Sequence, residues 1–496
     1  MIRYPNIKQS KPPELAISKF NGINQSLDNV LTGLEYASSA QNCDISSGVL
    51  KRCKGSTVYN TAKLATNITS LMAHFKGGTG SILAVSEGNI YKLTGSSWGS
   101  AILTGLQSSD MRYINYQKDM DEILIFTNGV DPIKVYDGSI FRNLKNRAAI
   151  HNPDGSILNW LDGDGSTHSS EAECTSLAPV FKYITLYKER VWGADNKGIY
   201  FSKDMDPDDW TAPSDEIEVN QHGGYIDIPT WDGGQIIGLR NLWDDLLIFK
   251  TKTVHRIFGT YPGNFELIQV FSEMNGHILD KTISAGRNVA FWATSSGVFM
   301  YLGGTGDADL TPAIQEEFSK VNKAAIDNSV GIVFKDKYIL AMPEGSSTVP
   351  NMIFEYDINK KTFMVKRGMN ISTFLELGER LIYADGNGIL YEYNIGDTYG
   401  DQPIASSYTT GTVFLANKVF SFDAVNFICK GDGQVKISVI TEERTESIVV
   451  SLSGQEKVIQ RDLMNEGRRI AFKFENVNGS YFEIKQPQFV GTIDID

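Results

Sequence analysis

Cysteine is scarce in this sequence. The 496 residues include only Cys43, Cys53, Cys174 and Cys429, and no two of them form a CxxC pair. A disulfide framework is typical of short, cysteine-dense secreted chains, so we expect four reduced thiols here. Cys43 and Cys53 are spaced so that they could flank a hairpin, which requires no bond between them.

Long apolar runs and targeting signals are also missing. No stretch approaches 18 uninterrupted apolar residues, so no membrane-spanning helix is expected. The first residues, MIRYPNIKQSKPPELAI, contain no apolar core and no small-residue cleavage site. We therefore expect no secretory signal; if the protein leaves its cell, we expect it to do so by a route other than secretion.

Familiar catalytic and cofactor motifs are absent as well. The six histidines are scattered without HxH or HExxH spacing, and there is no GxSxG, no P-loop and no GxGxxG before a helix. No cysteine lies in a recognisable catalytic context. We therefore nominate no catalytic residue, no metal ligand and no cofactor, and expect a protein that is not an enzyme.

Basic residues are outnumbered by acidic ones. Lys and Arg total 46 against 59 Asp and Glu, which gives a net charge of -13. A protein that grips nucleic acid needs clustered basic residues for the phosphates, so that class is disfavoured. A surface past which DNA slides is still compatible with this charge, because an acidic wall repels phosphate.

Glycine and aromatic residues are plentiful, and they recur in a repeated unit. Each copy has an apolar run, a turn of Gly, Asp or Asn, and a second run with alternating aromatic residues. The seven copies are residues 81–98, 121–141, 187–210, 244–259, 288–304, 337–357 and 379–394. Their spacing is irregular and the WD40 and kelch signatures are missing. The copies predict an all-β fold, an irregular β-propeller of about seven blades; a barrel or sandwich assembly is the alternative.

The repeats divide the chain into three parts. Residues 66–400 are the expected propeller, and the polar, turn-rich residues 1–65 are interpreted as an N-terminal arm laid over it. Residues 401–496 show strand patterns without the blade unit, which predicts a C-terminal β-sandwich. A polar insertion at 151–175 is expected to be an exposed loop. Short helices are expected near 312–328.

A group of carboxylates closes the third copy of the repeat. The stretch KDMDPDDW contains Asp204, Asp206, Pro207, Asp208 and Trp210. Asp before Pro and at the start of a turn caps backbone N–H groups, so we interpret these residues as a structural turn whose tryptophan covers the blade. On this interpretation Asp208→Asn should leave assembly intact. A glycosidase site and a metal site are the alternatives.

The polar insertion partly matches a calcium-binding loop. Asp162, Asp164 and Ser166 fit the first three ligand positions of an EF-hand, but Thr167 stands where that loop has Gly. We interpret the segment as an acidic loop and leave calcium binding open.

The order of several motifs resembles a known family. Residues 20–56, FNGINQSLDNVLTGLEYASSAQNCDISSGVLKRCKGS, are similar to the F-x-G-[LI]-N, N-x-D and G-x-L-x-x-R-x-G motifs of bacteriophage tail proteins. The residues assigned to these motifs are Phe20, Gly22, Asn24, Asn42, Asp44, Gly48, Gly55 and, for the arginine of the third motif, Arg52 or Lys51; at the spacing of that motif the arginine position itself is Cys53. Residues 190–210, RVWGADNKGIYFSKDMDPDDW, and 236–259, IIGLRNLWDDLLIFKTKTVHRIFG, resemble the same family. In the first of these, Met205 replaces the usual Gly before the D-P pair.

The resemblance implies a structural role in a virion. Such proteins form the tail hub or nozzle of short-tailed phages, a homohexameric ring of β-propeller subunits around the DNA-ejection channel. The implied partners are other copies of the chain, the portal and adaptor, a fibre or plug protein, and viral double-stranded DNA that passes without sequence-specific binding. The implied location is the virion tail, assembled in the host cytoplasm, with no membrane insertion. The alternative is a propeller-based receptor-binding or glycan-degrading virion protein.

Overall fold

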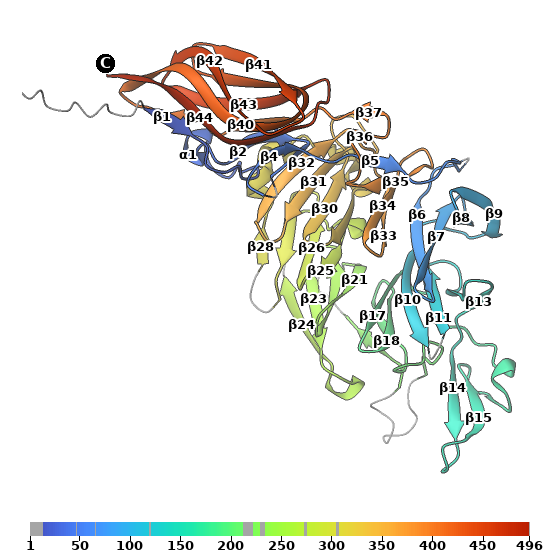
Figure 1. The fold of residues 1–496 in the computed structure, drawn as a ribbon. Coiled ribbons are helices and arrows are strands. Elements are labelled where there is room, and N and C mark those ends of the chain that lie inside the picture. Colours follow the sequence, from blue (N-terminus) through green and yellow to red (C-terminus); the bar gives the residue numbers. More distant parts are fainter. Residues whose placement is uncertain are drawn as a thin grey trace, which may run out of the picture.

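The computed structural model shows an all-β protein with two main parts, a ring of small sheets and a C-terminal domain built on one 11-stranded sheet (Figure 1). It describes residues 13–495, except 46, 65, 119–120, 212–221, 229–233, 272–274 and 304–306. Among the described helices, none is both long and apolar enough to cross a membrane. The first residues of the expected arm, 1–12, lie outside the described part.

Within the described residues, seven sheets of four to six strands follow one another along the chain, and we number them as blades. Blade 1 contains β6 (Ser70–Lys76), β7 (Thr79–Ser86), β8 (Asn89–Thr94) and β9 (Ser97–Leu103). Blade 2 contains β10 (Arg112–Lys118), β11 (Asp121–Thr127), β12 (Lys134–Tyr136) and β13 (Phe141–Asn143). Blade 3 contains β17 (Tyr183–Tyr187), β18 (Arg190–Ala194), β19 (Gly198–Phe201) and β20 (Gly224–Asp227).

The remaining blades follow the same order. Blade 4 contains β21 (Ile236–Leu242), β22 (Asp245–Lys250), β23 (Val254–Phe258) and β24 (Glu266–Phe271). Blade 5 contains β25 (Ser284–Gly286), β26 (Val289–Ala293), β27 (Val298–Tyr301) and β28 (Asp307–Asp309). Blade 6 contains β29 (Val330–Phe334), β30 (Lys337–Met342), β31 (Met352–Asp357) and β32 (Thr362–Arg367). Blade 7 contains β33 (Thr373–Leu377), β34 (Arg380–Ala384), β35 (Leu390–Tyr393) and β5 (Ser56–Val58).

The blades form a closed ring, so the predicted β-propeller is confirmed. The first strands of neighbouring blades are in contact all the way round, from β6 through β10, β17, β21, β25 and β29 to β33 and back to β6. Each predicted copy of the repeat coincides with the second and third strands of one blade. These strands are the most buried, because they lie between two other strands and between two neighbouring sheets; β26 (VAFWA) is buried at every position.

Tight turns between the first two strands of the blades explain part of the sequence pattern. The turn residues Lys188 and Glu189 in blade 3, and Arg287 and Asn288 in blade 5, all have positive φ. Two consecutive residues with positive φ are the mark of the type I′ turn, whose twist matches that of the strands it joins.

The ring is closed by a strand from the N-terminal part of the chain. β5 pairs antiparallel with β35, with Val58 opposite Tyr391 and Ser56 opposite Tyr393. A strand from the beginning of the chain thus completes the last blade, which ties the two ends of the propeller together. Two short strands, β36 (Thr398–Tyr399) and β37 (Gln402–Pro403), extend the same sheet.

The expectation of an exposed loop at 151–175 is wrong. The chain there forms a three-stranded antiparallel sheet, β14 (Arg147–His151), β15 (Ile157–Asp162) and β16 (Thr167–His168), followed by the short helix η1 (Glu171–Glu173). The sheet projects from the ring between blades 2 and 3 (Figure 1). Gly155 and Gly165, both with positive φ, allow the two turns that join its strands.

The C-terminal domain is built around one long strand, β40 (Lys418–Ile440). Its first half pairs with β42 (Lys457–Gly467) and β44 (Phe482–Ile495), and its second half with β41 (Thr445–Ser453) and β43 (Arg469–Val477). Two further strands are β38 (Ser407–Thr410) and β39 (Val413–Phe414). The rings of Phe472 and Phe489 stack in the core with their centroids 3.6 Å apart.

The N-terminal segment is integrated into this domain rather than laid over the propeller alone. Its strands β1 (Glu14–Ala16), β2 (Ala37–Gln41), β3 (Cys43–Asp44) and β4 (Leu50–Arg52) join the sheet of the C-terminal strands, and α1 (Asn29–Thr32) lies between β1 and β2. Figure 1 shows these blue strands beneath the red and orange domain. β1 and β4 both pair with β44, which lies more than 400 residues away in sequence.

Two smaller sequence predictions are confirmed. The helices η5 (Thr311–Ile314), α2 (Gln315–Phe318) and η6 (Lys323–Asn328) occur where short helices were expected, and η3 (Pro262–Asn264) and η4 (Asp280–Thr282) are further short turns. All four cysteines are free and buried, and Cys43 lies directly opposite Arg52 in the β3–β4 hairpin that Cys53 follows.

Candidate functional site

The residues of the N-terminal motif gather where the N-terminal segment, the propeller and the C-terminal domain meet, and we call this region the junction. Phe20 inserts its buried ring into the C-terminal domain, at centroid distances of 5.3 Å from Tyr408 and 5.5 Å from Phe474, both in edge-on geometry. Edge-on aromatic pairs stabilise a core beyond the area that they bury. Phe20 therefore fastens the N-terminal segment to the C-terminal domain.

Gly22 lies against blade 6, and Asn24 forms the turn that follows it. A Cβ atom on Gly22 would lie 2.6 Å from the carbonyl oxygen of Phe363, so no other residue fits there without displacing β32. The following amide, that of Ile23, donates to the same oxygen at 2.9 Å. Asn24 forms a local turn, in which its Oδ1 accepts from the amide (3.1 Å) and the hydroxyl (2.6 Å) of Ser26.

Asn42 forms the hydrogen bonds that connect the parts of the chain at the junction. Its side chain is buried and donates from Nδ2 to the carbonyl of Ala405 at 2.8 Å. Its Oδ1 accepts from the amide of Arg367 at 2.9 Å and from the hydroxyl of Tyr399 at 3.1 Å. Asn42 has φ of 54°, which asparagine tolerates better than most residues. One amide side chain thus links blade 6, blade 7 and the strand that enters the C-terminal domain.

Asp44 and Gly48 shape the β3–β4 hairpin beside Asn42. Asp44 lies opposite Lys51 in the hairpin. Gly48 has φ of 74°, in the left-handed region that favours glycine, and its carbonyl accepts from the amide of Phe20 at 3.0 Å. The hairpin turn therefore positions Phe20 for its contacts with the C-terminal domain.

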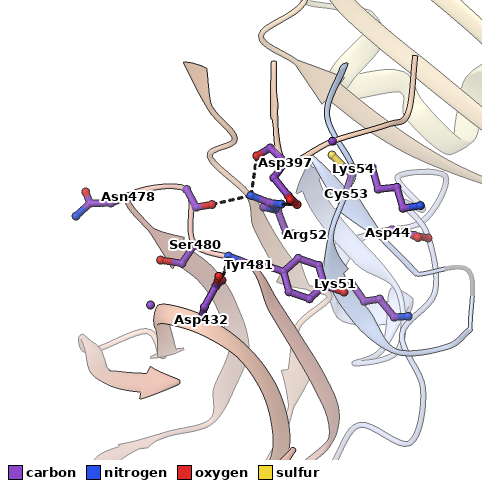
Figure 2. Close-up of a pocket in the computed structure, with 13 residues that line it drawn as sticks. Asp44, Lys51, Arg52, Cys53, Lys54, Asp397, Asp432, Asn478, Ser480 and Tyr481 are labelled. Atoms are coloured by element: carbon purple, nitrogen blue, oxygen red, sulfur yellow. Dashed lines mark hydrogen bonds and ion pairs between the residues drawn. The ribbon is translucent and has the colours of Figure 1, made fainter. Parts of the chain in front are cut away.

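Arg52 joins blade 7 to the C-terminal domain on the other side of the hairpin. Its Nη1 donates to the carbonyls of Asp397 and Gly479, both at 2.9 Å, and its Nη2 contacts the Asp397 carboxylate at 2.5 Å. Its guanidinium also lies 5.4 Å from the ring centroid of Tyr481. Figure 2 shows these bonds converging on the Arg52 guanidinium. Gly55 follows, and no space for any side chain exists beside it.

A cleft of about 800 Å³ opens over Arg52, between the β3–β4 hairpin, blade 7 and the C-terminal domain. Lys51, Lys54 and Asp432 line its wall (Figure 2). Burial raises the pKa of the neighbouring Cys53 thiol, which keeps it protonated rather than a thiolate nucleophile. The residues of the junction therefore hold three parts of the chain together through paired charges and backbone hydrogen bonds.

Sequence reasoning missed a buried charged cluster between blades 6 and 7. Glu355 in β31 lies 2.8 Å from Lys337 Nζ and 2.8 Å from Lys366 Nζ, and the hydroxyl of Tyr393 donates to it at 2.6 Å. The available signal was a charged residue inside the apolar strand patterns MIFEYD and TFMVKR. Charges at such positions must be paired, because an isolated buried charge is very costly.

The predicted turn at the end of the third repeat connects blade 3 with blade 2 and the inserted sheet. The Asp208 carboxylate accepts two parallel bonds from Arg142, at 2.8 and 2.9 Å, and a third from the Lys145 amide at 2.9 Å. Asp206 pairs with Arg147 Nη1 at 2.7 Å. A bidentate guanidinium–carboxylate pair fixes both position and orientation. These carboxylates therefore hold neighbouring sheets together.

Asp204 and Trp210 lie at the two ends of this turn. Asp204 is 3.6 Å from Arg190, and Met205 after it has φ of 57°. The indole of Trp210 donates to the Pro207 carbonyl at 2.8 Å and packs against Phe181 at 5.4 Å between ring centroids.

These contacts change the expectation for Asp208→Asn. The Asp208 side chain is only 4% exposed, and asparagine would leave the Arg142 guanidinium without its counter-charge. We expect the variant to lose about 2 kcal/mol of unfolding free energy, the range of a hydrogen bond to a charged group. Chemical denaturation monitored by tryptophan fluorescence measures this loss. Asp244→Asn, which removes a surface ion pair between Lys188 and a carboxylate that is 89% exposed, is the matched control and should unfold like the parent protein.

In the segment that partly matches a calcium-binding loop, the first carboxylate accepts hydrogen bonds from backbone amides. Asp162 accepts from the amides of Gly163 (2.9 Å), Thr175 (2.8 Å) and Ser176 (3.0 Å). These bonds lower its pKa although burial opposes them. Across the ranges that the structure describes, no group of three or more His, Cys, Asp or Glu is placed to hold a metal ion.

Comparisons with known proteins identify no family for this chain. Neither a family model nor a curated protein matches it. Among solved structures, it is similar to the computationally designed Ika8 protein, with 9% identity over 69% of this chain and 100% of that chain and a TM-score of 0.38. It is also similar to the extracellular domain of a putative hybrid two component system from B. thetaiotaomicron, with 9% identity over 82% and 47% and a TM-score of 0.43. The Neurospora crassa Pan2 WD40 domain matches with 11% identity over 69% and 94% and a TM-score of 0.35. These similarities concern the fold alone.

Proposed function

We propose that the protein is a structural component of a bacteriophage tail, a hub or nozzle subunit that assembles into a ring around the genome-ejection channel. The observation that carries this proposal is the place of the motif residues. Those that resemble the tail-protein pattern, Phe20, Gly22, Asn42, Arg52 and Gly55, all lie at the junction, and each makes a contact that few other residues could replace.

The one departure from the motif at residues 190–210, Met205, is also consistent with the proposal. Met205 stands where the tail-protein pattern has Gly, and it adopts φ of 57°, the left-handed conformation that glycine favours. The backbone at this position therefore keeps the shape that the pattern requires, at the cost of some strain in a residue with a side chain.

The architecture is consistent with a rigid structural subunit. Closure of the propeller by β5 and the shared sheet of β1–β4 with β44 tie both ends of the chain into one body. The acidic balance, with a net charge of -13, would keep DNA from adhering to a channel wall. The glycan-degrading alternative gains no support from the acidic turn, where Asp206 and Asp208 are each held by an arginine.

Assembly of the purified full chain tests the proposal. We expect native mass spectrometry and negative-stain microscopy to show rings of six copies of the 54.9 kDa chain, alone or with co-produced portal and adaptor proteins. An antibody against the chain should label the tails of virions in the electron microscope. A chain that stays monomeric with these partners and does not label tails would contradict the proposal. Release of reducing sugar from host surface glycans would favour the enzymatic alternative instead.

A further inference from the structure

A cavity of about 340 Å³ lies at the centre of the propeller ring. It is lined from the first strands of all seven blades, and its charged residues are Asp110, Arg112, Arg240, Lys281 and Glu376. Central cavities where several elements converge, with a few charged groups among apolar ones, are the usual place for small ligands.

Cationic side chains gather at the end of this cavity where the first strands begin. Asp110 lies 2.6 Å from Arg112 Nη1, 3.2 Å from Lys182 Nζ and 3.6 Å from Lys281 Nζ. Asp280 lies 2.9 Å from Arg112 Nη2 and 3.7 Å from Lys182. Two carboxylates are thus shared among three cations, which leaves positive charge uncompensated.

Arg240 adds a fourth cation to this cluster without adding a carboxylate. Its Nε donates to the carbonyl of Ile283 at 3.0 Å, and its Nη1 donates to that of Leu239 at 2.8 Å. No carboxylate of the described chain lies within ion-pair distance of it. Burial first, and then repulsion from Arg112, lower the pKa of Arg240 to about 10, while Asp280 opposes this shift.

Glu376 does not supply the missing charge. It is the second carboxylate on the cavity wall, but it lies in β33 two residues before the turn at Gly378. Arg112 is the first residue of β10, and Lys281 precedes β25. Among the described residues, Glu376 forms no ion pair with Arg112, Arg240 or Lys281, and it also borders the neighbouring depression that contains Arg287.

We propose that Arg240, together with Lys281 and Arg112, forms a binding site for a small oxyanion, a phosphate or a carboxylate, inside the propeller. The two bonds to backbone carbonyls hold the Arg240 guanidinium in place and leave its Nη2 donors for a ligand. A planar guanidinium matches the two oxygens of a carboxylate or phosphate in a bidentate arrangement. The bound anion would supply the charge that the cluster lacks. This site is independent of ring assembly and of the proposed role in a tail.

Isothermal titration calorimetry of the full chain tests the site. Sodium phosphate and sodium citrate are titrated separately at constant ionic strength in a chloride buffer, which distinguishes an inorganic from a carboxylate ligand. We expect one site per chain for at least one of them, and a melting temperature that rises with its concentration. Arg240→Gln should weaken binding by at least about tenfold, the effect of losing one charge-assisted contact.

Two variants make the outcome decisive. Arg287→Gln changes the same residue type in the neighbouring depression, outside the cavity, where Arg287 pairs with Asp336 at 3.2 Å, and it should bind like the parent protein. Arg240→Lys keeps the charge and should bind more weakly than the parent protein but more tightly than Arg240→Gln. The proposal is overturned if neither anion binds the parent protein, or if Arg240→Gln binds as tightly as the parent protein. Equal loss in Arg287→Gln would also overturn it, because the anion would then not bind specifically at Arg240.

Discussion

Gly55→Ala should prevent the propeller from closing, with a loss of more than about 4 kcal/mol of unfolding free energy. A Cβ atom on Gly55 would lie 1.9 Å from the carbonyl oxygen of Thr398 and 2.6 Å from its carbon. Both are backbone atoms, so no side-chain rotation can relieve the clash. Gly55 also exchanges backbone bonds with Gly396 (2.9 Å) and Ile395 (3.0 Å), and the displacement would separate β5 from blade 7.

Soluble yield and chemical denaturation of the variant measure this effect. Gly99→Ala is the matched control, because the nearest atom to its added Cβ would be the Lys92 carbonyl oxygen at 3.9 Å. Gly99 lies exposed in β9, where alanine should change stability by less than about 1 kcal/mol. If Gly55→Ala unfolds at the same denaturant concentration as Gly99→Ala, then β5 is not the strand that secures the ring.

Glu355→Gln should destabilise the contact between blades 6 and 7 by about 3–5 kcal/mol at neutral pH. The side chains of Glu355 and Lys366 are only 4% and 2% exposed, and their charged atoms are 2.8 Å apart. Glutamine keeps the size of the side chain but removes the charge, so the Lys366 ammonium would stay buried without a counter-charge. Breaking one side of a buried pair costs far more than removing both partners.

The effect of Glu355→Gln should depend on pH. Burial raises the pKa of Glu355, but the ammonium groups of Lys337 and Lys366 outweigh it and hold the pKa well below its usual range. The carboxylate therefore contributes its full stability above the pKa of an unfolded Glu, about 4.3, and loses it as the pH falls from there. The difference between parent and variant should be largest at pH 7 and shrink below about pH 4.

Two controls define what this result means. Glu379→Gln removes a carboxylate that is 93% exposed and pairs with Lys335 at 3.3 Å, and it should have little measurable effect at any pH. The double change Glu355→Gln with Lys366→Met should recover part of the lost stability, because no buried ammonium is left without a partner near Tyr393. A pH-independent loss in Glu355→Gln alone would contradict the electrostatic explanation.

Two elements show most clearly what local sequence patterns could not predict. β5 is three residues long, SerThrVal, and has no alternation to predict a strand. Its partner Tyr391 lies more than 300 residues away, and nothing in the sequence pattern specifies that pairing. The inserted sheet was missed because its strands β14, β15 and β16 are short and flanked by polar turns, which resemble an exposed loop.

The candidate sites likewise combine residues that the sequence singled out with residues that only the fold brings together. The motifs singled out Gly22, Asn42 and Gly55, because these residues stand in a pattern that resembles a family, but they did not indicate which parts of the fold meet there. Their partners Phe363, Arg367 and Thr398 carry no motif and are recognised only in three dimensions. The anion site of Arg240 combines side chains from different blades, so no local stretch of sequence could suggest it.

By itself, the sequence determined the all-β class, the number of blades and the position of each blade, because an apolar run, a turn and an alternating run are local patterns that bury a sheet on both faces. Tertiary structure alone decided how the ring closes, which strands complete the C-terminal domain and which charges meet. The physical reason is distance along the chain. Hydrogen bonding between strands is the same for any sequence, so remote pairing depends on the fit of whole surfaces rather than on a readable local signal.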